Sequence, residues 1–184
     1  NYVFVYYSKD ANGDETPDKY QTTVVFGAIN GTVDGTTQVE KVVTLLGKDG
    51  KPSEDGSYNL SENDIPEALA AAGYDQATKT WDAEPVGAII DKKEDTKVTF
   101  IVSFAEAEQT YTVQYIDEDT NEGLGEQVVK EAKYGTYITG ADEAVEFAGY
   151  VFTRATDLRV SEHNDSNYVF VYYSKDANGD ETPD

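Results

Sequence analysis

Apolar and polar residues alternate along much of this chain, and a period of two is typical of β-strands with one buried face. Residues 20–26, 98–104 and 111–116 show the alternation most clearly. Residues 37–46 and 126–134 have the same β character with a less regular pattern. Asn-Gly and Asp-Gly pairs between such segments are turn signals. The pattern therefore predicts a mainly β protein with some α+β character.

The clearest helical signal covers residues 61–73. Asp64 and Glu67 have the spacing of a capping box, and Pro66 falls in the first turn, where its missing N–H costs little. Ser61 is a competing N-cap. Residues 141–147 are compatible with a short helix or with an irregular crossing. The order of strands around the first helix predicts a small mixed sheet with one helix across it.

One stretch of sequence occurs twice. Residues 1–18 and 167–184 both read NYVFVYYSKDANGDETPD, at an offset of 166 residues. Chance does not produce such an identity, so we interpret the chain as one full period of a longer array plus a short overlap. A period of this length is enough for one or two domains that each bury a core of their own.

The two halves of the period also echo one another. Each half opens with a Tyr-led alternating strand, passes through Ala-Gly-Tyr (residues 72–74 and 148–150) and ends in an apolar strand. We favour duplication of a domain as the cause, and the alternative is convergence on common β-domain turns.

The resulting domain prediction has four parts. Residues 1–18 are the end of a preceding repeat and an acidic linker, residues 19–106 form the first domain, residues 110–175 form the second, and residues 176–184 are the linker to the next repeat.

Charge limits the partners that the chain is expected to have. It carries 36 Asp and Glu against 14 Lys and Arg, for a net charge of −22. Nucleic-acid binding depends on Lys and Arg, and anionic membrane surfaces repel a polyanion, so we expect neither nucleic acid nor direct membrane insertion. There is no Cys, which excludes disulfides and thiol chemistry. Any targeting signal is expected to lie outside this sequence.

Catalytic patterns are weak. His163 is the only histidine and lies among polar residues, which is typical of a solvated loop. Carboxylates are so frequent that no acid–base pair stands out. We therefore expect a protein that is not an enzyme and that requires no cofactor.

Calcium is the one metal for which the sequence offers ligands. Asp10, Asn12 and Asp14 have the first spacings of an EF-hand loop, but Glu15 replaces the Gly of that loop, so we interpret the segment as a linker. A second acidic group consists of Asp117, Glu118 and Asp119. These three carboxylates are candidate Ca²⁺ ligands, and a solvated hairpin turn is the alternative.

Aromatic residues near turns are the candidate ligand-binding residues. Trp81, Tyr134 and Tyr137 occupy such positions. Aromatic rings at a surface combine an apolar face with a polar tip, which suits sugars and proteins. The alternative is that these rings cover the cores of small β-domains.

The second half resembles the mucin-binding (MucBP-type) domain of Gram-positive surface adhesins. The resemblance rests on an alternating strand that runs into an acidic turn, a Gly-Thr turn, a Gly-Tyr pair and a closing aromatic strand. In this sequence these are residues 111–119, 134–137, 149–150 and 168–173. The whole period resembles a repeat of the mucus-binding proteins of lactobacilli.

This resemblance implies two tandem domains, a β-grasp (ubiquitin-like) domain followed by a compact MucBP-type domain. It implies an extracellular adhesin on the bacterial cell wall that binds mucin glycoproteins or their glycans, with avidity from tandem copies. β-Grasp domains of this kind also resemble immunoglobulin-binding modules, so immunoglobulins are an alternative partner. A structural spacer in a surface stalk is the third hypothesis.

The repeated strand gives a last prediction. Residues 167–174 should pair with residues 111–116 inside the second domain. Residues 1–8 lack their own domain in this chain and should be disordered or docked on a neighbouring molecule.

Overall fold

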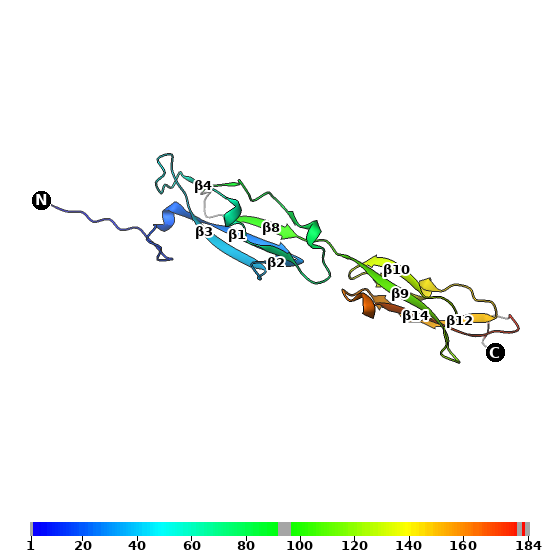
Figure 1. Cartoon of the computed structure of the whole chain (residues 1–184). Coiled ribbons are helices and arrows are strands. Elements are labelled where there is room, and N and C mark those ends of the chain that lie inside the picture. Colours follow the sequence, from blue (N-terminus) through cyan, green and yellow to red (C-terminus); the bar gives the residue numbers. More distant parts are fainter. Residues whose placement is uncertain (1, 92–96, 180–181, 183–184) are drawn as a thin grey trace. The chain divides into compact units, whose positions relative to one another are not determined.

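The computed structural model describes residues 2–91, 97–179 and 182 (Figure 1). It contains two compact units. Unit 1 comprises Asn1–Ala71 and Asp75–Ala105, and unit 2 comprises Ala72–Tyr74 and Glu106–Asp184. Both units are mainly β, which confirms the coarse fold prediction. Within the described residues the helical segments are short 3₁₀ turns, and none is an α-helix.

Unit 1 is built on a four-stranded mixed sheet in the order β3-β1-β8-β6 (Figure 1). Its strands are β1 (Gln21–Ile29), β3 (Gln38–Thr44), β6 (Thr80–Trp81) and β8 (Val98–Ser103). β1 and β3 form an antiparallel pair, β8 returns parallel to β1, and β6 lies antiparallel to β8. The predicted mixed sheet is therefore present, and the alternating residues 98–104 supply its β8.

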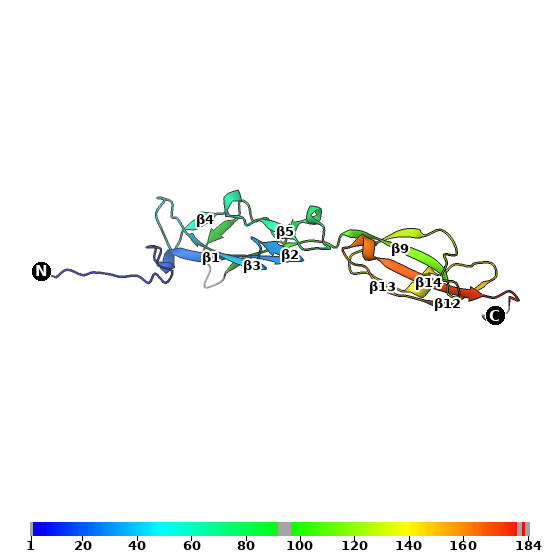
Figure 2. The same cartoon turned by 60° about the horizontal axis from the view of Figure 1, so that its bottom comes forward.

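The predicted helix over residues 61–73 is wrong. The structure has a 3₁₀ turn, η2 (Glu62–Asp64), followed by strand β5 (Ala68–Ala70), which pairs with β2 (Gly31–Val33) (Figure 2). Ile65 has φ −88° and ψ 124°, the extended conformation that a residue before proline prefers. The capping box of the structure joins Ser61, the competing N-cap, to Asp64, and does not join Asp64 to Glu67. Pro66 ends the turn, and pairing with β2 outweighs the helix propensity of the alanines.

The remaining elements of unit 1 are short. They are η1 (Asp18–Tyr20), β4 (Ser57–Asn59), η3 (Gln76–Thr78) and β7 (Ile89–Asp91). β4 pairs with β7 across the face of the main sheet that carries the core.

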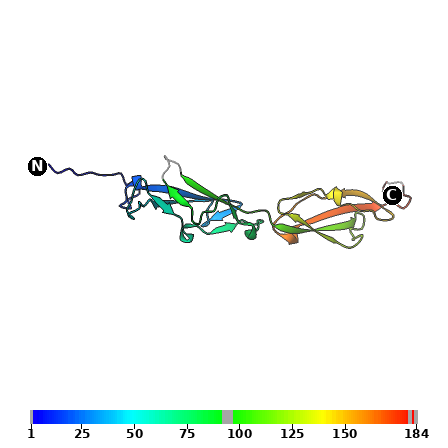
Figure 3. The same cartoon turned by 90° about the horizontal axis from the view of Figure 1, so that it is seen from above.

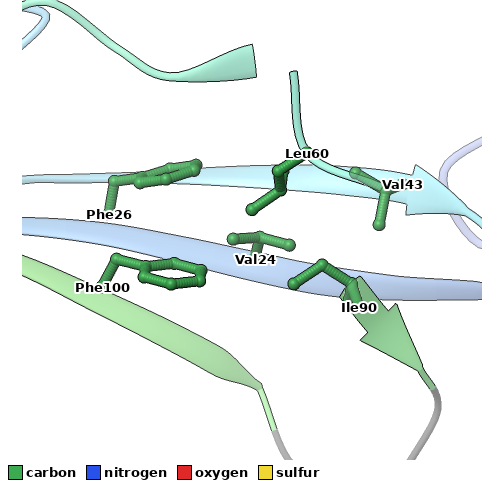
Figure 4. Packing of buried hydrophobic residues seen from close by; sticks show 6 residues of the cluster. All are labelled: Val24, Phe26, Val43, Leu60, Ile90 and Phe100. Carbon is green, nitrogen blue, oxygen red and sulfur yellow. The ribbon is translucent and has the colours of Figure 1, made fainter. Parts of the chain in front are cut away.

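Six buried residues form the core of unit 1, and Figure 4 shows how they face one another. They are Val24, Phe26, Val43, Leu60, Ile90 and Phe100. The rings of Phe26 and Phe100 stack with centroids 5.8 Å apart, one from β1 and one from β8. Leu60 and Ile90 come from the segments that cross the sheet, so these segments fill the place that a helix was predicted to take.

Unit 2 repeats the same connectivity in its four-stranded sheet, in the order β10-β9-β14-β12 (Figure 1; seen from above in Figure 3). Its strands are β9 (Glu108–Asp117), β10 (Val128–Lys133), β12 (Tyr150–Ala155) and β14 (Tyr168–Lys175). β9 and β10 are antiparallel, β14 lies parallel to β9, and β12 is antiparallel to β14. The predicted pairing of residues 167–174 with residues 111–116 is confirmed. The shared strand order supports duplication.

Shorter elements complete unit 2. They are β11 (Tyr137–Ile138), η4 (Gly140–Glu143), β13 (Leu158–Arg159) and η5 (Asn164–Ser166). η4 shows that the segment predicted as a helix or an irregular crossing is a single 3₁₀ turn followed by irregular chain. β11 pairs with β13 in a separate two-stranded ladder.

The core of unit 2 alternates valines with tyrosines from the two central strands. They are Tyr111, Val113 and Tyr115 from β9, and Val169, Val171 and Tyr173 from β14. The tyrosine hydroxyls reach partners at the edge of the core: Tyr111 donates to Glu143, and Tyr173 donates to the carbonyl of Val145 at 2.9 Å. The buried tyrosines of unit 2 therefore need hydrogen-bond partners for their hydroxyls, whereas the Phe and Leu side chains in the core of unit 1 need none.

Each unit fastens its crossing segment to the sheet with one carboxylate, and we call these groups the carboxylate clamps. In unit 1, Asp64 on η2 accepts from Lys41 of β3 at 2.6 Å and from the hydroxyl of Tyr58 at 2.9 Å. In unit 2, Glu143 on η4 accepts from Lys130 of β10 and from Tyr111 at 3.0 Å. Both clamps join the second strand of the hairpin to the 3₁₀ turn.

The two copies of the repeated sequence differ completely in environment. Residues 168–175 are the central strand β14, whereas Tyr2, Val3, Phe4, Val5, Tyr6 and Tyr7 are 67–91% exposed. Within the described residues no strand pairs with residues 2–8. The described part of the segment therefore lies outside both four-stranded sheets. That residues 1–8 are disordered or docked on a neighbouring molecule stays a prediction.

The acidic segment after it is ordered by local hydrogen bonds. The carboxylate of Asp10 accepts from the backbone N–H groups of Gly13 and Glu15 at 2.8 and 3.0 Å. The backbone N–H of Asp18 donates to the carbonyl of Lys9, which closes the turn. In the second copy the N–H of Gly179 donates to Asp176 in the same way at 2.7 Å. The shared turn shows that this conformation is local.

Candidate functional site

A groove of about 430 Å³ in unit 2 is the candidate site that contains one of the predicted aromatic residues, Tyr134. We call it the Tyr134 groove. Its lining residues all belong to unit 2: Tyr74, Glu106, Tyr134, Gly135, Arg159, Val160, Ser161 and Glu162. The groove combines two aromatic rings with charged and hydroxyl groups, which is the chemistry of a site for a polar ligand with apolar faces.

Tyr134 follows β10 directly and is held in place by its backbone and its ring. Its N–H donates to the carbonyl of Ala107 at 2.9 Å, and its ring meets that of Tyr74 edge-to-face at 5.4 Å. Gly73, at φ +84°, allows this approach, because a Cβ there would lie 2.6 Å from the ring of Tyr134. Gly73 thus leaves the space that the ring of Tyr134 occupies, and the ring of Tyr74 packs against it.

The rim of the groove carries polar groups from β13 and the loop after it. Arg159 and Glu162 are exposed, and Val160 between them is buried. The N–H of Gly135 donates to the carbonyl of Val160 at 2.8 Å, so the two sides of the groove are joined by a backbone bond. Ser161 donates through its hydroxyl to Asn167 at 2.9 Å. The lining residues include one cation, the guanidinium of Arg159, beside the carboxylates of Glu106 and Glu162.

Tyr137 lies outside the groove lining but next to it in the ladder. Its Cα partner in the β11–β13 pair is Arg159, and it is 61% exposed. Its hydroxyl donates to Asp157, whose carboxylate also accepts from the N–H of Gly140 at 2.9 Å. The bond to Tyr137 lowers the pKa of Asp157, and that bond raises the pKa of Tyr137. Tyr134 and Tyr137 therefore come from the two sides of one turn.

Trp81 is in the other unit. It lies on β6, is half-buried and packs edge-to-face on Phe26 with centroids 6.1 Å apart. This arrangement matches the alternative of a ring that covers the core. The structure does not bring Trp81 together with Tyr134 and Tyr137 in one unit.

The acidic turn after β9 uses its first two carboxylates in the fold. Asp117 is buried and accepts from the N–H groups of Asp119 and Thr120 at 2.9 and 3.2 Å and from the hydroxyl of Tyr150. Burial acts to raise the pKa of Asp117, but these hydrogen bonds outweigh it and the pKa is lowered. Asp119 is exposed.

Glu118 points to a different set of partners. Its carboxylate accepts from the hydroxyl of Thr153 and from Nε of Arg154, both at 2.7 Å, and these bonds lower its pKa. In the described part of the chain no group of three or more His, Cys, Asp or Glu is arranged to hold a metal ion. Calcium binding by Asp117, Glu118 and Asp119 stays a prediction.

Sequence reasoning missed Tyr74, Arg159 and Glu162 as groove residues. The echo of Gly73-Tyr74 with Gly149-Tyr150 was visible, but it gave no sign that Tyr74 would belong to unit 2. His163, next to Glu162, is exposed in a polar loop, as the sequence indicated.

Comparisons with known proteins do not assign this chain to a family. The chain matches no protein-family model, and no curated protein matches it. Among the described residues no helix has the length and apolar character to cross a membrane.

Proposed function

We propose that this chain is a non-enzymatic adhesin repeat of a bacterial cell surface, which binds mucin glycoproteins through their glycans. The observation that carries the proposal is the Tyr134 groove in a chain whose ends repeat one another. A repeated unit with a modest site gains strength from tethered copies, by about 10²–10⁴ in overall affinity. The resemblance of residues 111–173 to mucin-binding domains supports the same conclusion.

In this proposal the two units are β-grasp-like domains in which irregular crossing segments replace the usual helix. The parallel pairing of the first and last strands, with a hairpin on one side, supports this interpretation for both units. Unit 2 is then the MucBP-type domain, and unit 1 is its longer relative.

Each groove residue has a role in the proposal. The rings of Tyr134 and Tyr74 offer apolar faces for the C–H side of a sugar ring. Arg159 binds the carboxylate or sulfate of an acidic sugar through its planar pair of N–H donors. Glu106 and Glu162 accept hydrogen bonds from sugar hydroxyls. Since the chain carries a net charge of −22, an acidic glycan needs this local cation.

The chain offers a matched pair for the test, because its two arginines both lie in unit 2. Arg159 lines the groove, whereas Arg154 stacks on Tyr172 at 3.6 Å and bonds to Glu118. Both R159Q and R154Q remove one positive charge. Binding to immobilised mucin should fall at least about tenfold for R159Q and little for R154Q. Equal effects would point to bulk charge and would overturn the assignment of the groove.

The avidity part of the proposal is tested with one and two tandem copies of the period on immobilised mucin. The tandem protein should bind much more tightly than the single copy, and removal of the glycans should abolish binding of both. No gain with copy number would contradict an adhesin that works by multivalency.

Immunoglobulin binding is the second candidate, and edge strand β10 favours it. Among the residues that the structure describes, β10 pairs with β9 alone, and Val129 on it is 65% exposed. An exposed edge can accept a partner strand through its free N–H and C=O groups. Binding that survives deglycosylation, or that occurs with purified immunoglobulin, would favour this function. A pure spacer would bind neither.

A further inference from the structure

The sheet of unit 2 has a second groove, on the face that does not carry the core. Along β9 and β14 the core residues alternate with Gln114, Ile116, Phe170 and Tyr172, which therefore lie on the other face. Phe170 lies beside Gln114 in the parallel ladder, and Tyr172 lies beside Ile116. These four residues and the loop between β9 and β10 contribute most of the lining of a groove of about 410 Å³, which we call the amide groove.

The described residues that line the amide groove are all uncharged. This is unusual for a chain in which 27% of the residues are Asp, Glu, Lys or Arg. Carboxylates of the same loop, such as Glu122 and Glu126, are not part of the lining. A charged ligand therefore finds no complementary charge in the groove, and a neutral ligand is favoured.

Three side-chain amides supply the polar groups of the groove, from Gln114, Asn121 and Gln127. Asn121 and Gln127 are exposed and Gln114 is half-buried, and these side chains have no hydrogen-bond partner among the residues that the structure describes. The turn fixes Asn121, which has φ +59° and donates its backbone N–H to the carbonyl of Asp117 at 2.8 Å. Each amide offers an acceptor oxygen and two N–H donors, so the groove can both donate and accept.

One aromatic ring of the groove is supported from outside it. Phe170 is half-buried, and its ring stacks on that of Tyr168 with centroids 5.9 Å apart and an angle of 10° between the planes. The ring of Tyr172 is already covered by the guanidinium of Arg154 at 3.6 Å. Phe170 is therefore the ring that we assign to the ligand, and its fixed position lowers the entropic cost of binding.

The strand order itself does not require aromatic rings on this face. In unit 1, β8 has the place that β14 has in unit 2, as the third strand of four and parallel to the first strand of the unit. On β8 the buried Phe100 and Val102 alternate with Thr99, Ile101 and Ser103, which lie on the face away from the core. Unit 1 thus builds the same sheet with small or aliphatic side chains where β14 carries rings.

We propose that the amide groove binds a neutral sugar residue of a glycan chain. The amides of Gln114, Asn121 and Gln127 bond to its hydroxyls, and the ring of Phe170 contacts its C–H face. A sugar hydroxyl donates and accepts, as the amides do. A proline-rich peptide could also lie on aromatic rings, but proline has no N–H and would leave the amide oxygens unused. The proposal does not depend on the Tyr134 groove, where Arg159 suits an acidic group.

The test uses the full chain labelled with ¹⁵N and a panel of neutral disaccharides built from glucose, galactose, mannose and N-acetylglucosamine. NMR observes the side-chain NH₂ groups of Asn and Gln directly. At least one disaccharide should shift the NH₂ signals of Gln114, Asn121 and Gln127 together, with a single Kd. This Kd should change less than about twofold between low and high salt, because no charge takes part. If no disaccharide shifts these signals, the proposal is wrong.

Two glutamines of unit 2 provide a matched pair of variants. Gln127 lines the groove, whereas Gln109 lies on β9 and is not part of the lining. Q127A should raise the Kd at least about threefold, because hydrogen bonds to the sugar are lost, and Q109A should leave it unchanged. Equal effects of the two variants would overturn the assignment of the amides.

A third variant tests the ring. F170V removes the ring and keeps a residue that favours strands, so it should raise the Kd about tenfold. Backbone signals of unit 1 and of the core of unit 2 should stay in place, which shows that the variant is folded. A Kd equal to that of the parent chain would overturn the assignment of Phe170.

Two controls separate this groove from its alternatives. An uncharged proline-rich peptide should not shift the three NH₂ signals, and if it does so while no disaccharide does, the groove is a peptide site and the proposal is wrong. R159Q should bind the neutral disaccharide as the parent chain does. Failure of the Tyr134 groove on mucin would therefore leave the disaccharide result intact, whereas a loss in R159Q would show that the sugar occupies the Tyr134 groove instead.

Discussion

Units 1 and 2 share one strand order but fill it differently. Unit 1 packs Phe, Leu and Ile between its sheet and two crossing segments, whereas unit 2 buries three tyrosine rings, and the hydroxyls of Tyr111 and Tyr173 reach hydrogen-bond partners at the edge of the core. Both hold the crossing segment with a carboxylate clamp, Asp64 with Lys41 or Glu143 with Lys130. The strand order and the position of the clamp are thus common to both units, whereas the residue types that fill the core differ between them.

The largest expected loss of stability comes from substitutions in the two cores, and these substitutions test whether the cores unfold separately. F26A should destabilise unit 1 by about 3–5 kcal/mol, because it removes a fully buried ring that contacts Phe100 and Trp81. Y173A should do the same to unit 2, where Tyr173 contacts Tyr115 and Phe147. Amide exchange resolved by NMR would follow each unit, and the single Trp81 reports on unit 1 by fluorescence. If either variant weakened both units alike, they would share one cooperative core.

The carboxylate clamps should come next. The side chain of Asp64 is only 8% exposed and accepts from Lys41, Ser61 and Tyr58. D64N should destabilise unit 1 by about 1–3 kcal/mol at pH 7, since charge-assisted bonds to a buried group are lost. E143Q should weaken only unit 2. If D64N also destabilised unit 2, the two clamps would not each stabilise their own unit alone.

Acid should narrow the difference in stability between D64N and the parent chain. The ammonium of Lys41 and the bonds from Ser61 hold the pKa of Asp64 well below its usual range. A carboxyl with a lowered pKa in the folded state stabilises fully at pH values above its unfolded pKa of about 3.9, and this contribution decreases as the pH falls from that value towards the lower folded pKa. Thermal unfolding of the two chains between pH 7 and pH 2 would show the curves converging. Curves that stay parallel would contradict the role of the Asp64 charge.

Alkali should affect unit 2 through its tyrosine core. Burial and the bond to Glu143 raise the pKa of Tyr111 to about 12. A group with a raised pKa stabilises below its unfolded pKa of about 10, and this contribution is lost between pH 10 and pH 12. The melting temperature of unit 2 should fall by a few degrees over this range, and Y111F should reduce the fall. A Y111F chain with the full alkaline loss would show that other groups cause it.

The smallest effects should come from exposed ion pairs, which the two units also share. Lys97 pairs with Glu40 on unit 1, and Arg154 pairs with Glu118 on unit 2, all at least one-third exposed in their side chains. Removal of either cation should change stability by less than about 0.5–1 kcal/mol. Chemical denaturation at low and high salt would measure this, and a larger loss would show that these pairs act as clamps too.

Strands were largely predictable from the sequence because a period of two depends only on which face of each strand is buried. The alternation of residues 98–104 and 111–116 located β8 and β9, and the repeated apolar segment located β14. The helix over residues 61–73 failed because propensity is local, whereas Ala68–Ala70 pairs with Gly31–Val33 more than 30 residues away.

The candidate site was predictable only in part. The sequence predicts Tyr134 as a ligand-binding residue because it is an aromatic residue at a turn, and in the structure it lines the groove. Its neighbours Tyr74 and Arg159 are distant in sequence, on either side of it, and neither periodicity nor turn signals report such pairings. The same reason hid the clamps, since Lys41 and Asp64 are 23 residues apart.

The parallel pairs β1–β8 and β9–β14 determine how each unit responds to pulling. In each pair the first strand of the unit lies beside the last, and both run in the same direction. Tension applied to the two ends of a unit therefore slides one central strand along the other. All hydrogen bonds of that ladder must then break together, rather than one after another as in a strand peeled from an edge. Each unit with this arrangement is suited to hold a load that is applied along its length.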